Sequence, residues 1–247
     1  MILGGKASRR GRGGYDTGMT APLDLPVVVS STDDLREAAG DAAAGPLDAL
    51  ADALQGRGAC RLAGWPEPAL REALRDDLRR LQAEGALAQA AIGRNDGRSL
   101  RDDIRADRTR WLDDPRCGPA AGVFLERLDA LRIALNRRLF LGLDEVEAHY
   151  AAYPPGGGYA RHRDRFRDSD ARVVSLVTYL NEDWEADDGG ALRLHFEEDG
   201  GGESCIDFAP TRGSVCFLSE LEHEVLPARR ERLSIAAWFR RAPIVAR

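Results

Sequence analysis

The chain has 247 residues, of which 43% are hydrophobic and 31% charged, and its formal net charge is −6. This composition is typical of a soluble globular protein, and the length fits one large domain or two small ones. No apolar run approaches the roughly 20 residues that span a bilayer, so we expect no membrane contact. The acidic balance disfavours a nucleic-acid partner, whose phosphates need a positive field.

The N-terminal sequence MILGGKASRRGRGG has no apolar core of signal-peptide length, and the four cysteines contain no CxxC pair. We therefore expect a cytoplasmic protein without a disulfide framework. Residues 1–25 are rich in Gly, Arg and Pro and are predicted to form a disordered tail. Residues 26–247 are predicted to form a single domain. We expect a monomer, because no spare apolar helix is evident.

The first part of this domain, residues 33–142, is predicted to be a helical support. Leucines at helical spacing predict a helix over residues 47–56, and residues 59–65 read as a short strand. Two further amphipathic helices are predicted over residues 67–85 and 117–142. Between them, the polar and glycine-containing residues 93–103 are predicted to form a loop.

The pattern changes in the second part, residues 143–242, where short runs of Val, Leu, Tyr and Phe alternate with Gly, Asp and Pro clusters. The predicted strands are 145–153, 158–163, 172–180, 191–196, 204–208, 214–218, 222–227 and 231–240. Many short strands with frequent turn signals are typical of a β-sandwich or barrel. We therefore predict an α+β fold, in which N-terminal helices pack on one face of a β-core.

A short motif lies in YPPGGGYARHRDRF, residues 153–166, where one residue separates His162 from Asp164. Residues two apart on a strand point to the same face, so an imidazole and a carboxylate would lie side by side. A third ligand must come from elsewhere in the chain. The candidates are His149, His195 and His223. Two histidines and one carboxylate form the facial triad of non-haem Fe(II) oxygenases.

A metal triad alone also fits a cupin of another function, and Arg232 is the residue that distinguishes an oxygenase from such a cupin. It lies nine residues after His223, near the start of the last predicted strand. A guanidinium there can bind a carboxylate bidentately, as the far end of 2-oxoglutarate requires. Tyr179, in SLVTYLNEDW, is a candidate hydroxyl donor to the same carboxylate.

Taken in order, these motifs resemble the prolyl hydroxylase-domain family of Fe(II)/2-oxoglutarate-dependent dioxygenases, which contains the hypoxia-factor prolyl hydroxylases and bacterial relatives. The resemblance covers roughly residues 50–240. It is carried by YPPGGGYARHRD, by YLNEDW followed by GGALRL, and by HEVLPARRERLSIAAWF. The fold that it implies is a double-stranded β-helix, the jelly-roll of cupin type.

The resemblance implies a role for each matching position around the metal and the cosubstrate. The Fe(II) ligands would be His162, Asp164 and His223. Arg232 and Tyr179 would hold the far carboxylate of 2-oxoglutarate, and Tyr153 would lie near its iron-chelating end. The pocket wall would be formed by Val177, Leu192 and Trp238.

On the substrate side, the segment IRADRTRWL resembles the family's segment after a mobile substrate-covering loop, which would be residues 93–103 here. The resemblance implies a pair between Asp107 and Arg172. The same match contains Arg105, and an arginine-rich rim that includes Arg161 would border a peptide groove. His149 stands where the vertebrate members carry a methionine. If residues 145–153 form a strand, His149 shares a face with Tyr153.

The resemblance implies an enzyme that uses Fe(II), 2-oxoglutarate and O2, with ascorbate as a reductant. It would hydroxylate a prolyl residue of a protein partner at C4, and a translation factor such as elongation factor Tu is the first candidate. One alternative is a hydroxylase of a free amino acid or other small molecule. A nucleic-acid demethylase would share the triad but conflicts with the acidic balance. A non-catalytic metal-binding module would be expected to have lost a ligand or the anchoring arginine.

Overall fold

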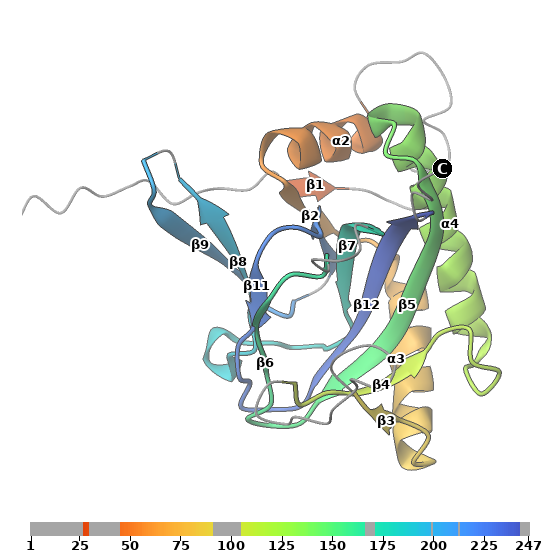
Figure 1. The fold of residues 1–247 in the computed structure, drawn as a ribbon. Helices are drawn as coiled ribbons and strands as arrows, with labels where there is room; N and C mark the ends of the chain where they lie inside the picture. Colours follow the sequence, from red (N-terminus) through yellow and green to blue (C-terminus); the bar gives the residue numbers. More distant parts are fainter. Residues whose placement is uncertain are drawn as a thin grey trace, which may run out of the picture.

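Two β-sheets of unequal size face each other in the computed structural model, and helices cover the outer face of the larger sheet (Figure 1). The structure describes residues 27–29, 45–90, 105–165, 171–198, 200–211 and 213–242. The predicted disordered tail at 1–25 and the predicted loop at 93–103 lie outside these described residues.

The helices are α2 (Pro46–Gly56), α3 (Pro68–Ala83) and α4 (Pro119–Leu139), and all were predicted. Each has a proline in its first turn, where the missing N–H would have no helical partner anyway. Leucines at three- and four-residue spacing form the buried stripes that pack on the sheet. Across the described residues, none of the helices is both long and apolar enough to cross a membrane.

The larger sheet has the strand order β1-β2-β10-β7-β12-β5-β4-β3, and every pairing except β1 with β2 is antiparallel. Its strands are β1 (Val27–Val29), β2 (Ala59–Ala63), β3 (Ala88–Gln89), β4 (Arg108–Trp111), β5 (Leu143–Tyr153), β7 (Arg172–Tyr179), β10 (Gly213–Leu218) and β12 (Arg232–Arg241).

The smaller sheet has the order β6-β11-β8-β9 and is fully antiparallel. Its strands are β6 (Tyr159–His162), β8 (Leu192–Glu197), β9 (Glu203–Phe208) and β11 (His223–Val225). A short 3-10 helix, η2 (Ala186–Asp188), precedes β8. Together the two sheets form the expected double-stranded β-helix.

The eight strands predicted from residue 145 onward are confirmed, although the strand predicted at 222–227 is shorter, at His223–Val225. The predicted helical support is only partly helical, because β3 and β4 also come from it and extend the larger sheet beyond β5. Neither strand was predicted. The sequence of β4, RTRW, does not alternate apolar and polar residues, and none of its four side chains is buried. Backbone pairing with β5 defines this strand, and periodicity cannot reveal such pairing.

Strand alternation divides the molecule into a core on the helix side and a second cluster between the sheets. On β5, Tyr150 and Ala152 belong to the core with the helices, whereas Ala151 and Tyr153 belong to the cluster between the sheets. On β12, Leu233, Ile235, Ala237 and Phe239 join the helix-side core. The intervening residues of β12 therefore point toward the smaller sheet.

The helix-side core gives a direct test of this packing. Phe124 on α4 is fully buried, so Phe124→Ala should lower the free energy of unfolding by about 3–5 kcal/mol. The matched control is Phe140, which is 88% exposed, and Phe140→Ala should change stability by less than about 0.5 kcal/mol. Urea unfolding followed by circular dichroism measures both values. Equal effects of the two substitutions would contradict the packing described here.

Candidate metal centre

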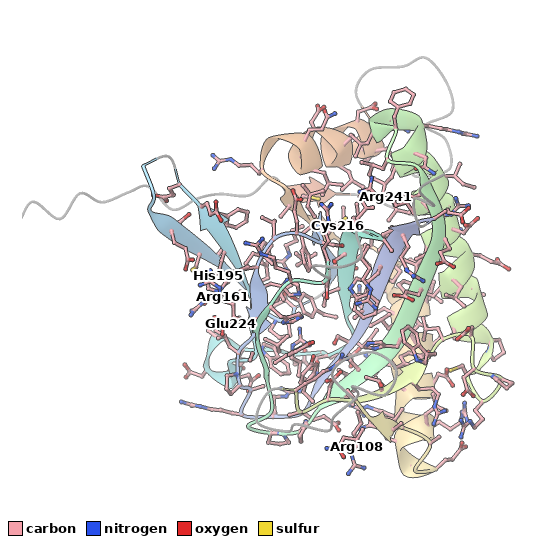
Figure 2. The ribbon with its side chains drawn as sticks, in the orientation of Figure 1. Arg108, Arg161, His195, Cys216, Glu224 and Arg241 are labelled. Carbon is pink, nitrogen blue, oxygen red and sulfur yellow. The ribbon has the colours of Figure 1, made fainter. Side chains whose placement is uncertain are left out.

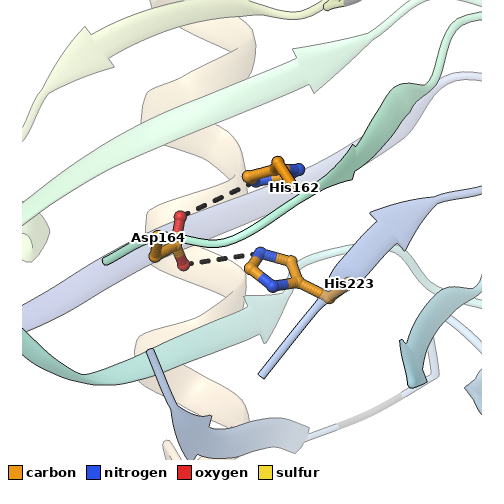
Figure 3. A group of neighbouring side chains, drawn as sticks. All are labelled: His162, Asp164 and His223. Atoms are coloured by element: carbon orange, nitrogen blue, oxygen red, sulfur yellow. Dashed lines mark ion pairs between the residues drawn. The ribbon is translucent and has the colours of Figure 1, made fainter. Parts of the chain in front are cut away.

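Three side chains with metal-binding atoms meet between the two sheets (Figure 3). His162 ends β6 and His223 begins β11, and these residues are direct partners in the antiparallel pairing. Asp164 follows β6 by two residues. Its Oδ1 lies 3.7 Å from His162 Nε2, and its Oδ2 lies 3.4 Å from His223 Nε2. All three ligand atoms lie within 4.8 Å of one another, so one ion could contact them all.

Backbone carbonyls fix the tautomer of both histidines. His162 Nδ1 lies 2.8 Å from the carbonyl oxygen of Ala160, and His223 Nδ1 lies 2.9 Å from that of Leu221. A carbonyl oxygen can only accept a hydrogen bond, so each Nδ1 carries the proton and donates it. Both Nε2 lone pairs are thereby left for a metal ion, the arrangement that orients metal-binding imidazoles.

Asp164 is buried, and hydrogen bonding holds it in place. Ser175 Oγ donates to its Oδ2 at 2.7 Å, and Ser219 Oγ lies 2.8 Å from Ser175 Oγ. Burial opposes ionisation of the Asp164 carboxyl, but His223, His162 and Arg172 outweigh it, so its pKa lies well below the usual range. Burial lowers the pKa of His223 to about 4. Near neutral pH the site thus offers a carboxylate and a neutral His223, a donor set that suits Fe(II).

The triad lies in a pocket whose walls include four of the predicted cosubstrate residues: Tyr153, Val177, Leu192 and Trp238. Val177 comes from β7 and Leu192 from β8, so both sheets contribute. The other lining residues include Arg105, His149 and Tyr159.

Arg232, at the start of β12, is a buried cation with no carboxylate partner among the described residues. Its side chain is 1% exposed, and Nε donates to the Gly190 carbonyl oxygen at 3.0 Å. Nη1 donates to Ser234 Oγ at 2.9 Å, and Nη2 is buried without a hydrogen-bond partner in the described part of the chain. Burying such a group is costly unless an anion pairs with it. A ligand carboxylate would satisfy this position, so these residues fit 2-oxoglutarate.

Two tyrosines flank this arginine. The Arg232 guanidinium carbon lies 5.2 Å from the ring centre of Tyr153 and 5.3 Å from that of Tyr179. Burial raises the pKa of Tyr179 to about 12, so its hydroxyl stays protonated and can donate. Its contact to the Phe208 carbonyl oxygen is long, at 3.4 Å.

The predicted pair between Asp107 and Arg172 is replaced by two other ion pairs. Asp107 is fully buried and accepts from Arg105, with Nε to Oδ1 at 2.7 Å and Nη2 to Oδ2 at 2.9 Å. Arg172 donates to Glu147 Oε1 and lies over the Trp238 ring, with its guanidinium carbon 3.8 Å from the ring centre. Arg105 is only two residues from Asp107, whereas Glu147 on β5 reaches Arg172 on β7 across the intervening strand β12.

Arg161, predicted at the rim of a peptide groove, forms ion pairs with Glu203 at the start of β9 and with Glu222 just before β11. His195 lies close by, and Figure 2 shows it with Arg161 and Glu224 on that side of the molecule. Its Nδ1 is 3.0 Å from Glu203, and its Nε2 is 3.2 Å from Glu224. With Cys205, His195 and Glu203 form a second cluster of metal-binding atoms. We assign it no ion, because Arg161 already neutralises Glu203.

Several supporting residues were missed by the sequence analysis. Ser175 holds Asp164, Ser234 holds Arg232, and Glu147 holds Arg172. A signal was available for two of them. Ser234 lies two residues after Arg232 on one strand, and Ser175 lies two residues before Val177, so each shares a face with a predicted site residue.

Comparison with known proteins places this geometry in a family. The family model described as the 2OG-Fe(II) oxygenase superfamily matches residues 148–240. A Pseudomonas putida prolyl-4-hydroxylase of known crystal structure is 44% identical, with a TM-score of 0.69, over 79% of this chain and 99% of that one. A Trichoplax adhaerens prolyl hydroxylase, solved with a hypoxia inducible factor oxygen degradation domain peptide fragment, is 26% identical with a TM-score of 0.68, over 77% and 87%.

Human Egl nine homolog 1 is 31% identical over 173 residues, which are 66% of this chain but 39% of that protein's length. The fold, the triad and these matches define an Fe(II)/2-oxoglutarate oxygenase. Within that superfamily, the chain belongs to the prolyl hydroxylase family. Proteins of this superfamily use Fe(II), 2-oxoglutarate and O2.

The support of Asp164 by Ser175 leads to a prediction on metal affinity. Ser175→Ala should weaken Mn(II) binding by about 10-fold or more, because hydrogen-bonding partners of metal ligands typically contribute that much. Titration of Mn(II) followed by electron paramagnetic resonance measures the affinity. Ser234→Ala is the matched control, since Ser234 bonds Arg232 and should leave Mn(II) affinity unchanged. Equal weakening in both variants would contradict this role of Ser175.

The buried histidines predict how the metal-free protein responds to acid. Burial lowers the pKa values of His149 and His223 from the ordinary 6.5 to about 4. Between these values the unfolded chain binds protons that the folded chain excludes, so the free energy of unfolding falls as pH falls. Each histidine contributes a slope of up to about 1.4 kcal/mol per pH unit. His149→Gln should make the fall shallower. Urea unfolding at about pH 7 and about pH 5 measures the fall in the free energy of unfolding for both proteins. An equal fall in the wild type and in His149→Gln would refute the lowered pKa of His149.

Proposed function

We propose that this protein hydroxylates a prolyl residue in a protein partner, with 2-oxoglutarate as cosubstrate and succinate and CO2 as products. The observation that carries the proposal is the unpaired Nη2 of buried Arg232, which packs on Tyr153 in the wall of the pocket that holds the complete His162–Asp164–His223 triad. A buried guanidinium without an anion favours a ligand that brings a carboxylate. A metal-binding module without catalytic function has no need of such a cation.

When bound, Fe(II) and 2-oxoglutarate supply the chemistry that converts a C–H bond into C–OH while the keto acid is decarboxylated. The triad residues would hold the metal on one side, and a three-residue set leaves other positions open. The backbone hydrogen bonds to both Nδ1 atoms keep the imidazoles oriented while ligands exchange. The C–H step needs no acid or base from the protein, and we assign none.

The pocket residues and the neighbouring Arg232 and Tyr179 would bind and orient the cosubstrate. Arg232 would pair with its far carboxylate, and the Tyr179 hydroxyl would donate to the same group. Leu192 and Val177 provide apolar walls, while the Tyr153 ring lies beside the arginine. Such walls exclude water, which strengthens the ion pair and limits side reactions.

The choice of a prolyl residue within a protein rests on the relatives. The similar P. putida protein is named a prolyl-4-hydroxylase, and the T. adhaerens enzyme was solved with a peptide fragment. Among protein substrates, we propose a translation factor such as elongation factor Tu for the first test.

The test measures succinate formation by anaerobically purified protein supplied with Fe(II), 2-oxoglutarate and air. It runs with and without a proline-containing fragment of elongation factor Tu. We expect stimulation by the fragment, and a product heavier by one oxygen atom in mass spectrometry. His223→Ala and Arg232→Ala should each reduce turnover by at least about 100-fold, because they remove a metal ligand and a buried anion partner.

The outcomes separate the alternatives. One outcome is turnover that neither this fragment nor other proline-containing proteins stimulate, together with hydroxylation of a free amino acid. This outcome would show that the substrate is a small molecule and not a protein. Iron binding without any 2-oxoglutarate binding or turnover would overturn the enzyme proposal. A thermal shift titration with Mn(II) and 2-oxoglutarate distinguishes this last case, since the ligand must stabilise the folded state if it binds.

A further inference from the structure

His149, in the middle of β5, is a buried histidine that the proposed chemistry does not use. Its side chain lines the same pocket as the metal triad, and the residue is 4% exposed. Two indole rings fix its position, because Trp111 meets it edge-on with ring centres 5.3 Å apart and Trp238 packs against it at 5.2 Å. The ring therefore has little freedom to turn.

The hydrogen bonds of His149 define which nitrogen carries its proton. Nδ1 lies 3.0 Å from the backbone carbonyl oxygen of Tyr150, which can only accept, so Nδ1 carries the proton. Nε2 lies 3.3 Å from Nη2 of Arg105. A guanidinium can only donate, so Nε2 presents a lone pair to it. Burial, and then the Arg105 charge, lower the pKa of His149 to about 4 and keep the ring neutral.

Arg105 is thereby held at two sides of its guanidinium. Nε and Nη2 donate to the buried carboxylate of Asp107, and Nη2 also reaches His149. Among the described residues, these bonds use Nε and Nη2, so the N–H groups of Nη1 can meet an acceptor on a ligand. Tyr159 is the other polar side chain beside the guanidinium. Asp107 alone would fix one edge of the guanidinium, while the histidine adds a second, independent point of attachment.

The position of Arg105 connects the group formed by Asp107, Arg105 and His149 to the metal centre. Its guanidinium carbon lies 4.9 Å from the ring centre of Tyr159. The Tyr159 ring stacks on His162, a metal ligand, with ring centres 3.7 Å apart and planes inclined by 21°. Arg105 also lines the pocket that contains the metal triad, and its side chain is 15% exposed, so a molecule bound in this pocket can reach it.

We propose that His149 is a positioning residue for substrate: it holds the Arg105 guanidinium so that Nη1 meets a carbonyl oxygen of the bound polypeptide. This proposal rests on the proposed function, because it assumes a substrate with backbone carbonyl groups. A methionine here, as the resemblance gives for vertebrate members, would fill the space but offers only a weak sulfur acceptor.

The test compares His149→Met with His149→Gln in the full-length protein. Glutamine carries an acceptor oxygen at about the distance of Nε2, whereas methionine fills similar volume without it. The assay measures kcat and KM for the elongation factor Tu fragment, and KM for 2-oxoglutarate. We expect His149→Met to raise KM for the fragment by about 10-fold, the loss expected for one hydrogen bond to a charged group, with a smaller change in kcat. His149→Gln should restore KM.

Equal impairment of both variants, or a loss confined to kcat or to KM for 2-oxoglutarate, would show that His149 acts through packing and would overturn the proposal. If the wild-type protein turns over 2-oxoglutarate but no proline-containing protein stimulates it, the proposed substrate class fails. Crystal structures of the two variants then decide the role of His149. Displacement of Arg105 in His149→Met but not in His149→Gln would support it, and an unmoved Arg105 in both would overturn it.

Discussion

The alternation of side chains along β12 is the constraint on which both the core and the site depend. Successive residues point to opposite faces, so Leu233, Ile235 and Ala237 pack under the helices while Arg232 and Trp238 face the smaller sheet. A shift of one residue in the pairing of β12 with β5 or β7 would bury the arginine in the leucine core. By packing on this core, the helices favour the register of β12 that keeps Arg232 on the side of the smaller sheet, although none of the three metal-binding residues lies on a helix.

Electrostatic preorganisation follows from the same architecture. Asp164 accepts a hydrogen bond from Ser175 and lies near the positive charge of Arg172, and its pKa is well below the usual range, so it is ionised inside the protein. Backbone carbonyls orient both imidazoles, and the Tyr159 ring stacks on that of His162. The metal centre is thus formed largely by the ends of β6 and β11 and by the turn after β6.

Much of this arrangement could be predicted from the sequence because its determinants are local. After residue 143, short runs rich in Val, Leu, Tyr and Phe alternate with Gly, Asp and Pro clusters, and His162 and Asp164 are only two residues apart. The β4 strand escaped prediction because its pairing with β5 is a backbone property that side chains do not record. The partner of Asp107 escaped because the choice between Arg105 and Arg172 depends on how an irregular segment turns. Ser175 and Ser234 could have been found by extending the alternation from known site residues.

The unpaired cation of Arg232 also bears on how long the protein survives in a cell. A buried guanidinium without its anion makes the folded state less favourable, and a bound carboxylate removes that penalty. A ligand that binds only the folded state lowers the fraction of unfolded chains as the ligand concentration rises. Proteases act on that unfolded fraction. The abundance of this protein would therefore rise and fall with the supply of 2-oxoglutarate, a central product of carbon metabolism, independently of its synthesis.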